Sequence, residues 1–194
     1  EGSTDSYVTI RDVGAEDYLR FYELNPLVVQ WAREHFTFLQ DASDRGSDVD
    51  VIEGDARIVL ERQLRQGDGQ RFDVLAIDAF SSDAVPIHLL TLESIQIYLE
   101  HLNKGGILAL HVTNRYVDLI PIVARLAEAV EVEAIYIDNQ SNRTRFVDST
   151  DWILLTNNRT FLDNEAVYVN RAPMPVPGSL WTDDFSSLFG IVHL

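Results

Sequence analysis

Acidic side chains follow several short apolar runs of the chain, at positions where a β-strand would end. Glu23, Asp55 and Asp78 stand at such positions, and Asn114 follows another run. In an open parallel sheet, ligands bind outside the carboxyl ends of the strands. An acid that ends a strand about 20 residues beyond a glycine loop usually binds ribose hydroxyls, and Glu23 lies 21 residues after Gly2. These residues predict a nucleoside site along one common sheet edge, although Glu23 taken alone is equally compatible with an exposed acid that has no ligand.

Two acids bracket a loop that leaves the most apolar strand predicted in the chain. Asp78 and Asp83 flank the sequence Ala-Phe-Ser-Ser. A carboxylate beside such a strand is costly to bury unless a cation or a hydrogen-bond donor meets it. The pair therefore predicts a site for an amine, with one acid receiving its proton and the other holding it in line. The alternative is that Asp83 caps the next turn and Asp78 accepts backbone N–H groups.

The histidines have no spacing that predicts a metal site. His88 follows the acidic loop and is expected to line the pocket, whereas His111 lies on an apolar strand and is interpreted as a core histidine. The remaining three are expected on the surface or in packing positions: His35, His101 and His193. The sequence also contains no nucleophile elbow, Walker loop or zinc pattern. We therefore expect no metal ion.

The net charge favours cationic partners. Fifteen Lys and Arg residues stand against 31 Asp and Glu residues, which gives a formal net charge of −16. Such a field repels phosphates and attracts cations, so nucleic acid is not an expected partner. No apolar run approaches the roughly 18 residues that a membrane helix needs, and no signal peptide is evident. We expect a cytoplasmic chain with no membrane partner, and we leave open a homodimer.

Apolar runs alternate with stretches of helical spacing, which is typical of βαβ units. Six strands are expected, at Leu19–Leu24, Asp50–Glu53, Phe72–Phe80, Ile107–Val112, Val132–Ile137 and Trp152–Thr156. Helices are expected at Leu27–Phe38, at Ala56–Leu64, from about Ser94 to Asn103 with Thr91 as its cap, and at Tyr116–Val130.

This pattern predicts an α/β fold with a mostly parallel, Rossmann-like sheet. Phe72–Phe80 is a continuous apolar run of the kind that is buried on both sheet faces, and Gly105-Gly106 is expected to close a helix. The last two strands are expected to be antiparallel. We expect one domain over residues 1–194, with residues 172–194 as a Pro-rich extension that packs back on it.

Five stretches together resemble the spermidine synthase family, in particular spermidine synthase-like proteins with a class I methyltransferase fold. They are residues 21–26 (FYELNP), 53–57 (EGDAR), 72–86 (FDVLAIDAFSSDAVP), 110–116 (LHVTNRY) and 181–186 (WTDDFS). Each is weak by itself, but their order and spacing extend over nearly the whole chain. The resemblance implies the strand order 3-2-1-4-5-7-6.

The resemblance also implies an activity, the transfer of an aminopropyl group from decarboxylated S-adenosylmethionine to a polyamine such as putrescine. Glu23 would bind the ribose, and Asp55, followed by Ala56, would bind the adenine amino group. Asp78 would assist deprotonation of the attacking amine, and Asp83 would hold it. Three further residues are assigned to the substrate: His88, Asn114 and Asp183. No permanently bound cofactor is expected.

The chain departs from the family pattern in two places. Two extra residues separate Asp78 from Asp83, which leaves the acceptor amine open. The family would also show a first strand and a Gly-x-Gly-x-Gly loop near the N-terminus. We interpret Gly2 as the last glycine of that loop and Ser3–Val13 as the helix after it, so that an N-terminally truncated domain is expected. Because most of the loop would precede Glu1, we expect weak nucleoside binding or slow turnover by this stretch alone.

Two other functions are compatible with the same residues. A methyltransferase that uses S-adenosylmethionine has the same fold, because the fold does not determine which sulfonium carbon is attacked. The paired acids Asp78 and Asp83 favour a diamine, whereas amide- and guanine-directed methyltransferases tend to have an Asn-Pro-Pro-aromatic loop there. A non-catalytic nucleoside or polyamine-binding module is the third hypothesis, and ligand binding without turnover would support it.

Overall fold

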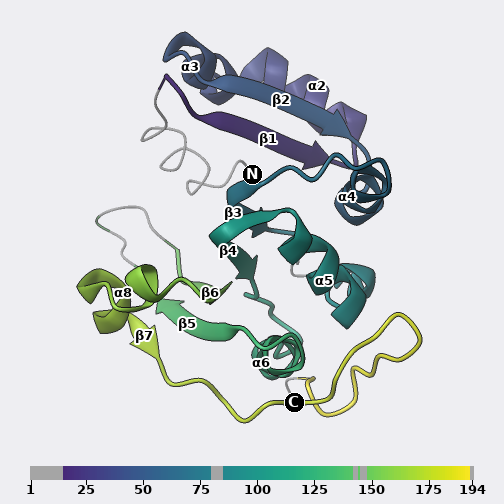
Figure 1. The fold of residues 1–194 in the computed structure, drawn as a ribbon, viewed down its shortest axis with the longest axis vertical. Coiled ribbons are helices and arrows are strands. Elements are labelled where there is room, and N and C mark those ends of the chain that lie inside the picture. The colour runs from purple at the N-terminus through teal and green to yellow at the C-terminus, as the bar shows by residue number, and fades with distance from the viewer. Residues whose placement is uncertain (1–14, 80–84, 142–143, 145–147, 193–194) are drawn as a thin grey trace. The chain divides into compact units, whose positions relative to one another are not determined.

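The chain forms two compact units in the computed structural model, Glu1–Val59 and Leu60–Leu194 (Figure 1). The structure describes residues 15–79, 85–141, 144 and 148–192. Two predicted site residues, Gly2 and Asp83, lie outside the described residues.

The first unit is built on two parallel strands, β1 (Tyr18–Glu23) and β2 (Asp48–Glu53). They pair along their whole length, so that Glu23 lies opposite Glu53 at their carboxyl ends. The connection between them contains the helices α2 (Pro26–His35) and α3 (Phe38–Asp44), which pack against these strands (Figure 1). This βαβ arrangement brings both carboxyl ends to the same edge, as the sequence predicted.

The single helix expected over Leu27–Phe38 is wrong, because the structure has two helices there. Phe36 adopts an extended conformation, with φ −119° and ψ 147°, and ends α2. Thr37 precedes α3, whose first residue Phe38 meets the Phe21 ring of β1 edge to face, with ring centroids 5.8 Å apart. The break thus turns a second apolar face toward the sheet.

The second unit contains a five-stranded sheet in the order β3-β4-β6-β5-β7. The strands are β3 (Phe72–Ile77), β4 (Leu102–His111), β5 (Glu133–Asn139), β6 (Thr150–Thr156) and β7 (Arg171–Ala172). β3 and β4 are parallel, whereas β6 is antiparallel to both β4 and β5. The prediction that the last two long strands form an antiparallel pair is therefore confirmed.

The strand order of each unit matches a contiguous part of the order 3-2-1-4-5-7-6. β2 and β1 correspond to strands 3 and 2, and the series β3-β4-β6-β5 corresponds to strands 4, 5, 7 and 6. The short strand β7 is an addition. In the described part of the chain, the first strand of that order has no counterpart.

Helices of the second unit pack on its sheet and enclose the core. α5 (Leu92–Glu100) contacts β4, and α6 (Ile120–Ala129) contacts β5 and β6. Thr91 caps α5 in a capping box with Ser94, as the sequence predicted. The core consists of fully buried side chains from the strands, the two helices and the C-terminal segment, among them Leu108, Leu110, Ile153, Leu155, Ile95, Ile122, Leu126 and Trp181.

Two expectations about β3 and β4 are wrong. Gly105 and Gly106 do not end a helix but lie inside β4, where the register with β3 shifts. A Cβ on Gly106 would lie 3.0 Å from the Phe72 carbonyl oxygen, so the close strand approach requires glycine. β3 is also not buried on both faces, because Val74 is 58% exposed whereas Leu75 is buried. Among the strands that the structure describes, β3 pairs with β4 alone and lies at an edge of this sheet.

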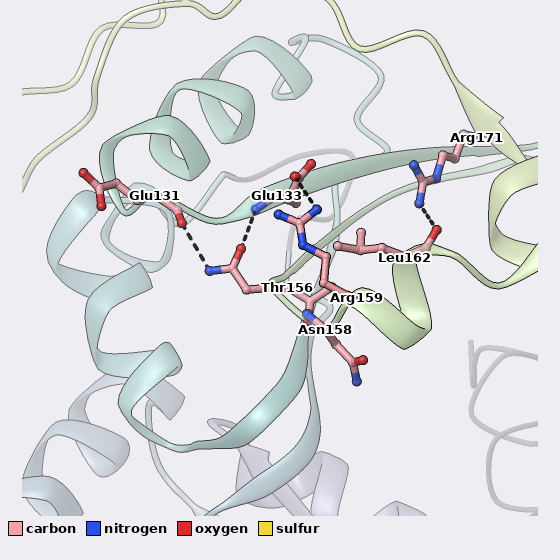
Figure 2. A network of polar contacts seen from close by, with 8 residues as sticks. Glu131, Glu133, Thr156, Asn158, Arg159, Leu162 and Arg171 are labelled. Atoms are coloured by element: carbon pink, nitrogen blue, oxygen red, sulfur yellow. Dashed lines mark hydrogen bonds and ion pairs between the residues drawn. The ribbon is translucent and has the colours of Figure 1, made fainter.

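A network of polar contacts lies at the end of the sheet where β5 begins (Figure 2). Arg159 pairs with Glu133 at 3.0 Å, and Asn157 accepts the Glu133 backbone N–H at 3.3 Å while donating to the Glu131 carbonyl at 3.2 Å. A groove beside α6 and residues 174–177 lies at the same end. Because β6 is antiparallel to both β4 and β5, β4 and β5 run in the same direction. The end where β5 begins is therefore opposite the end where β4 terminates.

No helix within the described ranges is long and apolar enough to cross a membrane.

His101 ends α5 as its C-cap and is fully buried. Its Nε2 donates to the Leu60 carbonyl at 3.0 Å, and its Nδ1 accepts the Gln70 backbone N–H at 3.2 Å. Burial lowers the pKa of His101 and outweighs the opposing effects of the Leu60 hydrogen bond and of the Asp68 and Glu100 charges. The neutral imidazole is therefore part of the folded structure, as expected for a packing residue.

We predict that stability decreases as the pH falls below the ordinary histidine pKa of about 6.5. The unfolded chain then binds a proton that folded His101 resists, and the loss grows toward the lower folded pKa by at most about 1.4 kcal/mol per pH unit. His101→Gln keeps an N–H donor but does not titrate, so it should show a flatter dependence. Urea unfolding of both proteins at about pH 7.5 and about pH 5 tests this. Equal pH dependence in the two proteins would contradict it.

Candidate functional site

The carboxyl edge of the two-stranded sheet presents Glu23 and Asp55. Glu23 is the last residue of β1, and its Oε1 accepts the Asn25 backbone N–H at 2.8 Å. Asn25 in turn caps α2 by accepting the Leu27 N–H at 3.0 Å. Asp55 follows β2 by two residues. The parallel pairing brings both predicted nucleoside residues to one edge of this unit.

Asp55 also begins the next helix. Its Oδ1 accepts the Ile58 N–H at 3.0 Å, and Ala56 is the first residue of α4 (Ala56–Arg65). Gly54 precedes it with φ 145°, and a Cβ there would lie 3.0 Å from Val59 Cγ2. Helix N-terminal N–H groups and a close-lying backbone are features that suit a polar ligand. One Asp55 oxygen is thus used as a helix cap, which is a structural role that the sequence analysis did not assign.

Asp78 and His111 meet at the carboxyl edge of the five-stranded sheet. The parallel register places Ile77 opposite Leu110, so the residues that follow, Asp78 and His111, lie side by side. His111 Nδ1 lies 2.5 Å from Asp78 Oδ1. The Asp78 side chain is 48% exposed and that of His111 only 19%. The interpretation of His111 as a core histidine is therefore wrong, because it stands at the sheet edge beside the predicted catalytic acid.

A hydrogen-bond network continues from His111 across the strand ends. Its Nε2 lies 2.8 Å from Thr113 Oγ1, which accepts the Asp151 backbone N–H at 2.6 Å. Tyr136 donates its hydroxyl to Asp151 Oδ1 at 2.7 Å. The Trp152 ring stacks on His111, with centroids 4.9 Å apart and planes at 22°. The network comes from three strands, β4, β5 and β6, and sequence reasoning singled out none of these partners.

The field at this edge is negative. The pKa of Tyr136 is raised first by burial, then by its hydrogen bond to Asp151 and by the charges of Asp151, Asp138 and Asp118. These carboxylates destabilise a phenolate and would stabilise a cation brought near them. The edge is thus electrostatically suited to a protonated amine.

The remaining predicted substrate residues are spread over the second unit. Asn114 follows β4, and its Oδ1 accepts the backbone N–H groups of Tyr116 at 2.9 Å and Val117 at 3.1 Å. His88 is exposed in a short 3-10 helix, Ile87–Leu89.

Asp183 lies at the start of α5. Its Oδ1 accepts the Thr91 hydroxyl at 2.8 Å, and its N–H donates to Glu93 Oε2 at 2.9 Å. The backbone of the neighbouring Trp181 accepts the Leu92 N–H at 2.9 Å. These bonds attach the C-terminal segment to the helix, and the predicted substrate contact of Asp183 stays a prediction.

A sequence comparison and a structural comparison each found proteins that are similar to this chain. No family model matches the chain. A curated relative, the polyamine aminopropyltransferase of Vibrio vulnificus (strain CMCP6), is 31% identical over 93 residues, which are 48% of this chain and 29% of that protein. A probable spermidine synthase from Corynebacterium glutamicum ATCC 13032 has a similar structure, with a TM-score of 0.50 and 16% identity over 79% of this chain and 60% of its own. The chain is thus similar in sequence to a polyamine aminopropyltransferase and similar in fold to a probable spermidine synthase.

A second solved structure supports the same fold. It is a spermidine synthase in complex with the transition state analogue AdoDATO, with a TM-score of 0.50 and 12% identity over 88% of this chain and 64% of its own. The chain thus has a Rossmann-like fold of the class I methyltransferase type. It matches less than a third of the curated relative's length and less than two thirds of either structure.

Proposed function

We propose that this spermidine synthase-like chain transfers the aminopropyl group of decarboxylated S-adenosylmethionine to a primary amine of a polyamine such as putrescine. The observation that carries the proposal is the Asp78 carboxylate, which is accessible at a negatively charged sheet edge and held at 2.5 Å by His111. The similarity to a polyamine aminopropyltransferase supports it.

The reaction needs a carboxylate beside the amine. A primary amine has a pKa near that of lysine, about 10.4, so it must lose a proton before it can attack. Its nitrogen then forms a bond to the sulfonium-linked propyl carbon while that C–S bond breaks. The products are an extended polyamine, methylthioadenosine and one proton released to solvent. Asp78 would orient the amine and stabilise its positive charge, and Asp83 would hold the amine in line.

Residues at the ends of β1 and β2 are proposed to bind the nucleoside. Glu23 offers its remaining oxygen to the ribose, and Asp55 and Ala56, at the start of α4, offer acceptor and donor groups to the adenine. Asn114 and His88 are proposed as further substrate residues.

Calorimetric titration with three nucleosides tests the proposal. Decarboxylated S-adenosylmethionine lacks the carboxylate of S-adenosylmethionine, so the acidic chain should bind it more tightly, and it should bind the product methylthioadenosine as well. Tighter binding of S-adenosylmethionine would favour methyl transfer instead. Binding of the nucleosides with no turnover of any of them would indicate a binding module.

We predict that Asp55→Ala weakens methylthioadenosine binding by about 1–3 kcal/mol, because the adenine amino group loses the hydrogen-bond acceptor that Asp55 is proposed to supply. Asp55→Ser is the matched variant, since serine retains a helix cap for α4 but not the second carboxylate oxygen. It should lose affinity to a similar extent while keeping more stability than Asp55→Ala. Asp83→Ala should have a smaller effect, because Asp83 is proposed to meet the amine. Equal losses of nucleoside affinity in Asp55→Ala and Asp83→Ala would count against these roles.

A further inference from the structure

The hydrogen bonds around His111 determine which ring nitrogen carries the proton. A carboxylate oxygen can only accept, so Nδ1, at 2.5 Å from Asp78 Oδ1, must be the donor. In a neutral imidazole with Nδ1–H, Nε2 is an acceptor, so the Thr113 hydroxyl, whose oxygen accepts the Asp151 N–H, donates to His111 Nε2 at 2.8 Å. The donors therefore form a directed series from the Asp151 backbone through Thr113 and His111 to Asp78.

The two partners of this pair differ in how firmly they are held. His111 is bonded at both ring nitrogens, stacked on Trp152 and 19% exposed. Asp78 follows the end of β3, and its side chain is 48% exposed. The imidazole is thus the fixed member, and the carboxylate is the accessible member whose direction it can set.

We propose that His111 is a positioning residue for the amine site: its Nδ1–H holds Asp78 Oδ1, so that the other carboxylate oxygen is left to meet the attacking amine. This inference rests on the proposed aminopropyl transfer. His111 does not touch the reacting atoms and takes no part in the bond changes. Its contribution is to limit rotation of the carboxylate, and a misplacement of about 1 Å at a reacting centre can lower a rate about 100-fold.

Three substitutions of His111 distinguish a role in orienting the Asp78 carboxylate from a role in packing. Asparagine can place an amide N–H near the position of Nδ1, whereas glutamine places one near the position of Nε2, and alanine places none. We expect His111→Asn to retain most of kcat, and His111→Gln and His111→Ala to lose roughly 10- to 100-fold. The KM for decarboxylated S-adenosylmethionine should stay the same in all three, because the nucleoside residues are unchanged. His35→Ala, on exposed α2, is the control for loss of a histidine elsewhere.

A merely structural role would give a different pattern. The three variants would then lose kcat in proportion to their loss of stability in urea unfolding, with no advantage for asparagine. If His111→Ala fails to fold, the comparison of asparagine with glutamine at this position still distinguishes the two roles.

A second measurement does not depend on turnover. Nitrogen NMR of the histidine ring should show the Nδ1–H tautomer of His111, and Asp78→Ala should change that signal. An Nε2–H tautomer, or an asparagine variant as impaired as the glutamine variant, would overturn the positioning role while the proposed function stood. Absence of aminopropyl transfer by the unsubstituted chain would overturn the proposed function, and the positioning role with it, even if the Nδ1–H tautomer were present.

Discussion

Asp78→Asn is expected to lower kcat for aminopropyl transfer about 100-fold, while the affinity for methylthioadenosine stays unchanged. Asparagine keeps the shape of the side chain and an oxygen that can still accept from His111 Nδ1. It removes the negative charge that would orient the protonated amine. The loss should therefore appear in catalysis and in the KM for the amine, and steady-state kinetics with both substrates measures it.

The matched control for this substitution lies on β3, the strand that Asp78 follows. Asp73 is also exposed and accepts a hydrogen bond from Asn103 Nδ2 at 2.8 Å, but it is at the opposite end of β3. Asp73→Asn changes the net charge equally and should leave kcat within about twofold, since exposed substitutions away from a site have small effects. Equal losses in Asp73→Asn and Asp78→Asn would show that total charge, and not the position of Asp78, controls the rate.

Trp181→Ala is expected to destabilise the second unit by about 3–5 kcal/mol. The indole is fully buried and stands next to the residues that fasten the C-terminal segment to α5. Its removal leaves a large cavity that the fixed helix and strands can fill only in part. The free energy of unfolding in urea measures the loss.

Two other substitutions serve as its controls. Trp181 Nε1 is buried and has no hydrogen-bond partner among the described residues, so Trp181→Phe removes an unsatisfied donor and should cost less than Trp181→Ala. Phe189→Ala removes an aromatic ring that is 96% exposed in the same segment, and should change stability by less than about 0.5 kcal/mol. A loss in Trp181→Ala as small as that in Phe189→Ala would show that the segment does not contribute to the core.

The strand ends were the part of the site most accessible to sequence reasoning. Asp78 follows β3 directly and Asp55 follows β2 by two residues, and the structure confirms both predicted strands. The pairing of Asp78 with His111 was missed because it depends on the register between two strands. Aligning the ends of the parallel strands, Ala-Ile-Asp and Ala-Leu-His, would have brought the two residues together.

The errors in the predicted elements have a common physical origin. Local propensity assigned Gly105 and Gly106 to a helix end, but the approach of the Phe72 carbonyl requires glycine within the strand. An apolar sequence likewise predicted a strand buried on both faces, whereas Val74 is 58% exposed and its neighbour Leu75, on the other face, is buried. Both features depend on what lies against the strand in space, which a single sequence does not show.

Identification of the reaction products tests the central proposal most directly. The chain is incubated with putrescine and decarboxylated S-adenosylmethionine, and in parallel with putrescine and S-adenosylmethionine, and the products are identified by mass spectrometry. The proposed function predicts equal amounts of spermidine and methylthioadenosine in the first reaction and no methylated amine in the second. Methylated amine together with S-adenosylhomocysteine, or no product in either reaction, would contradict it.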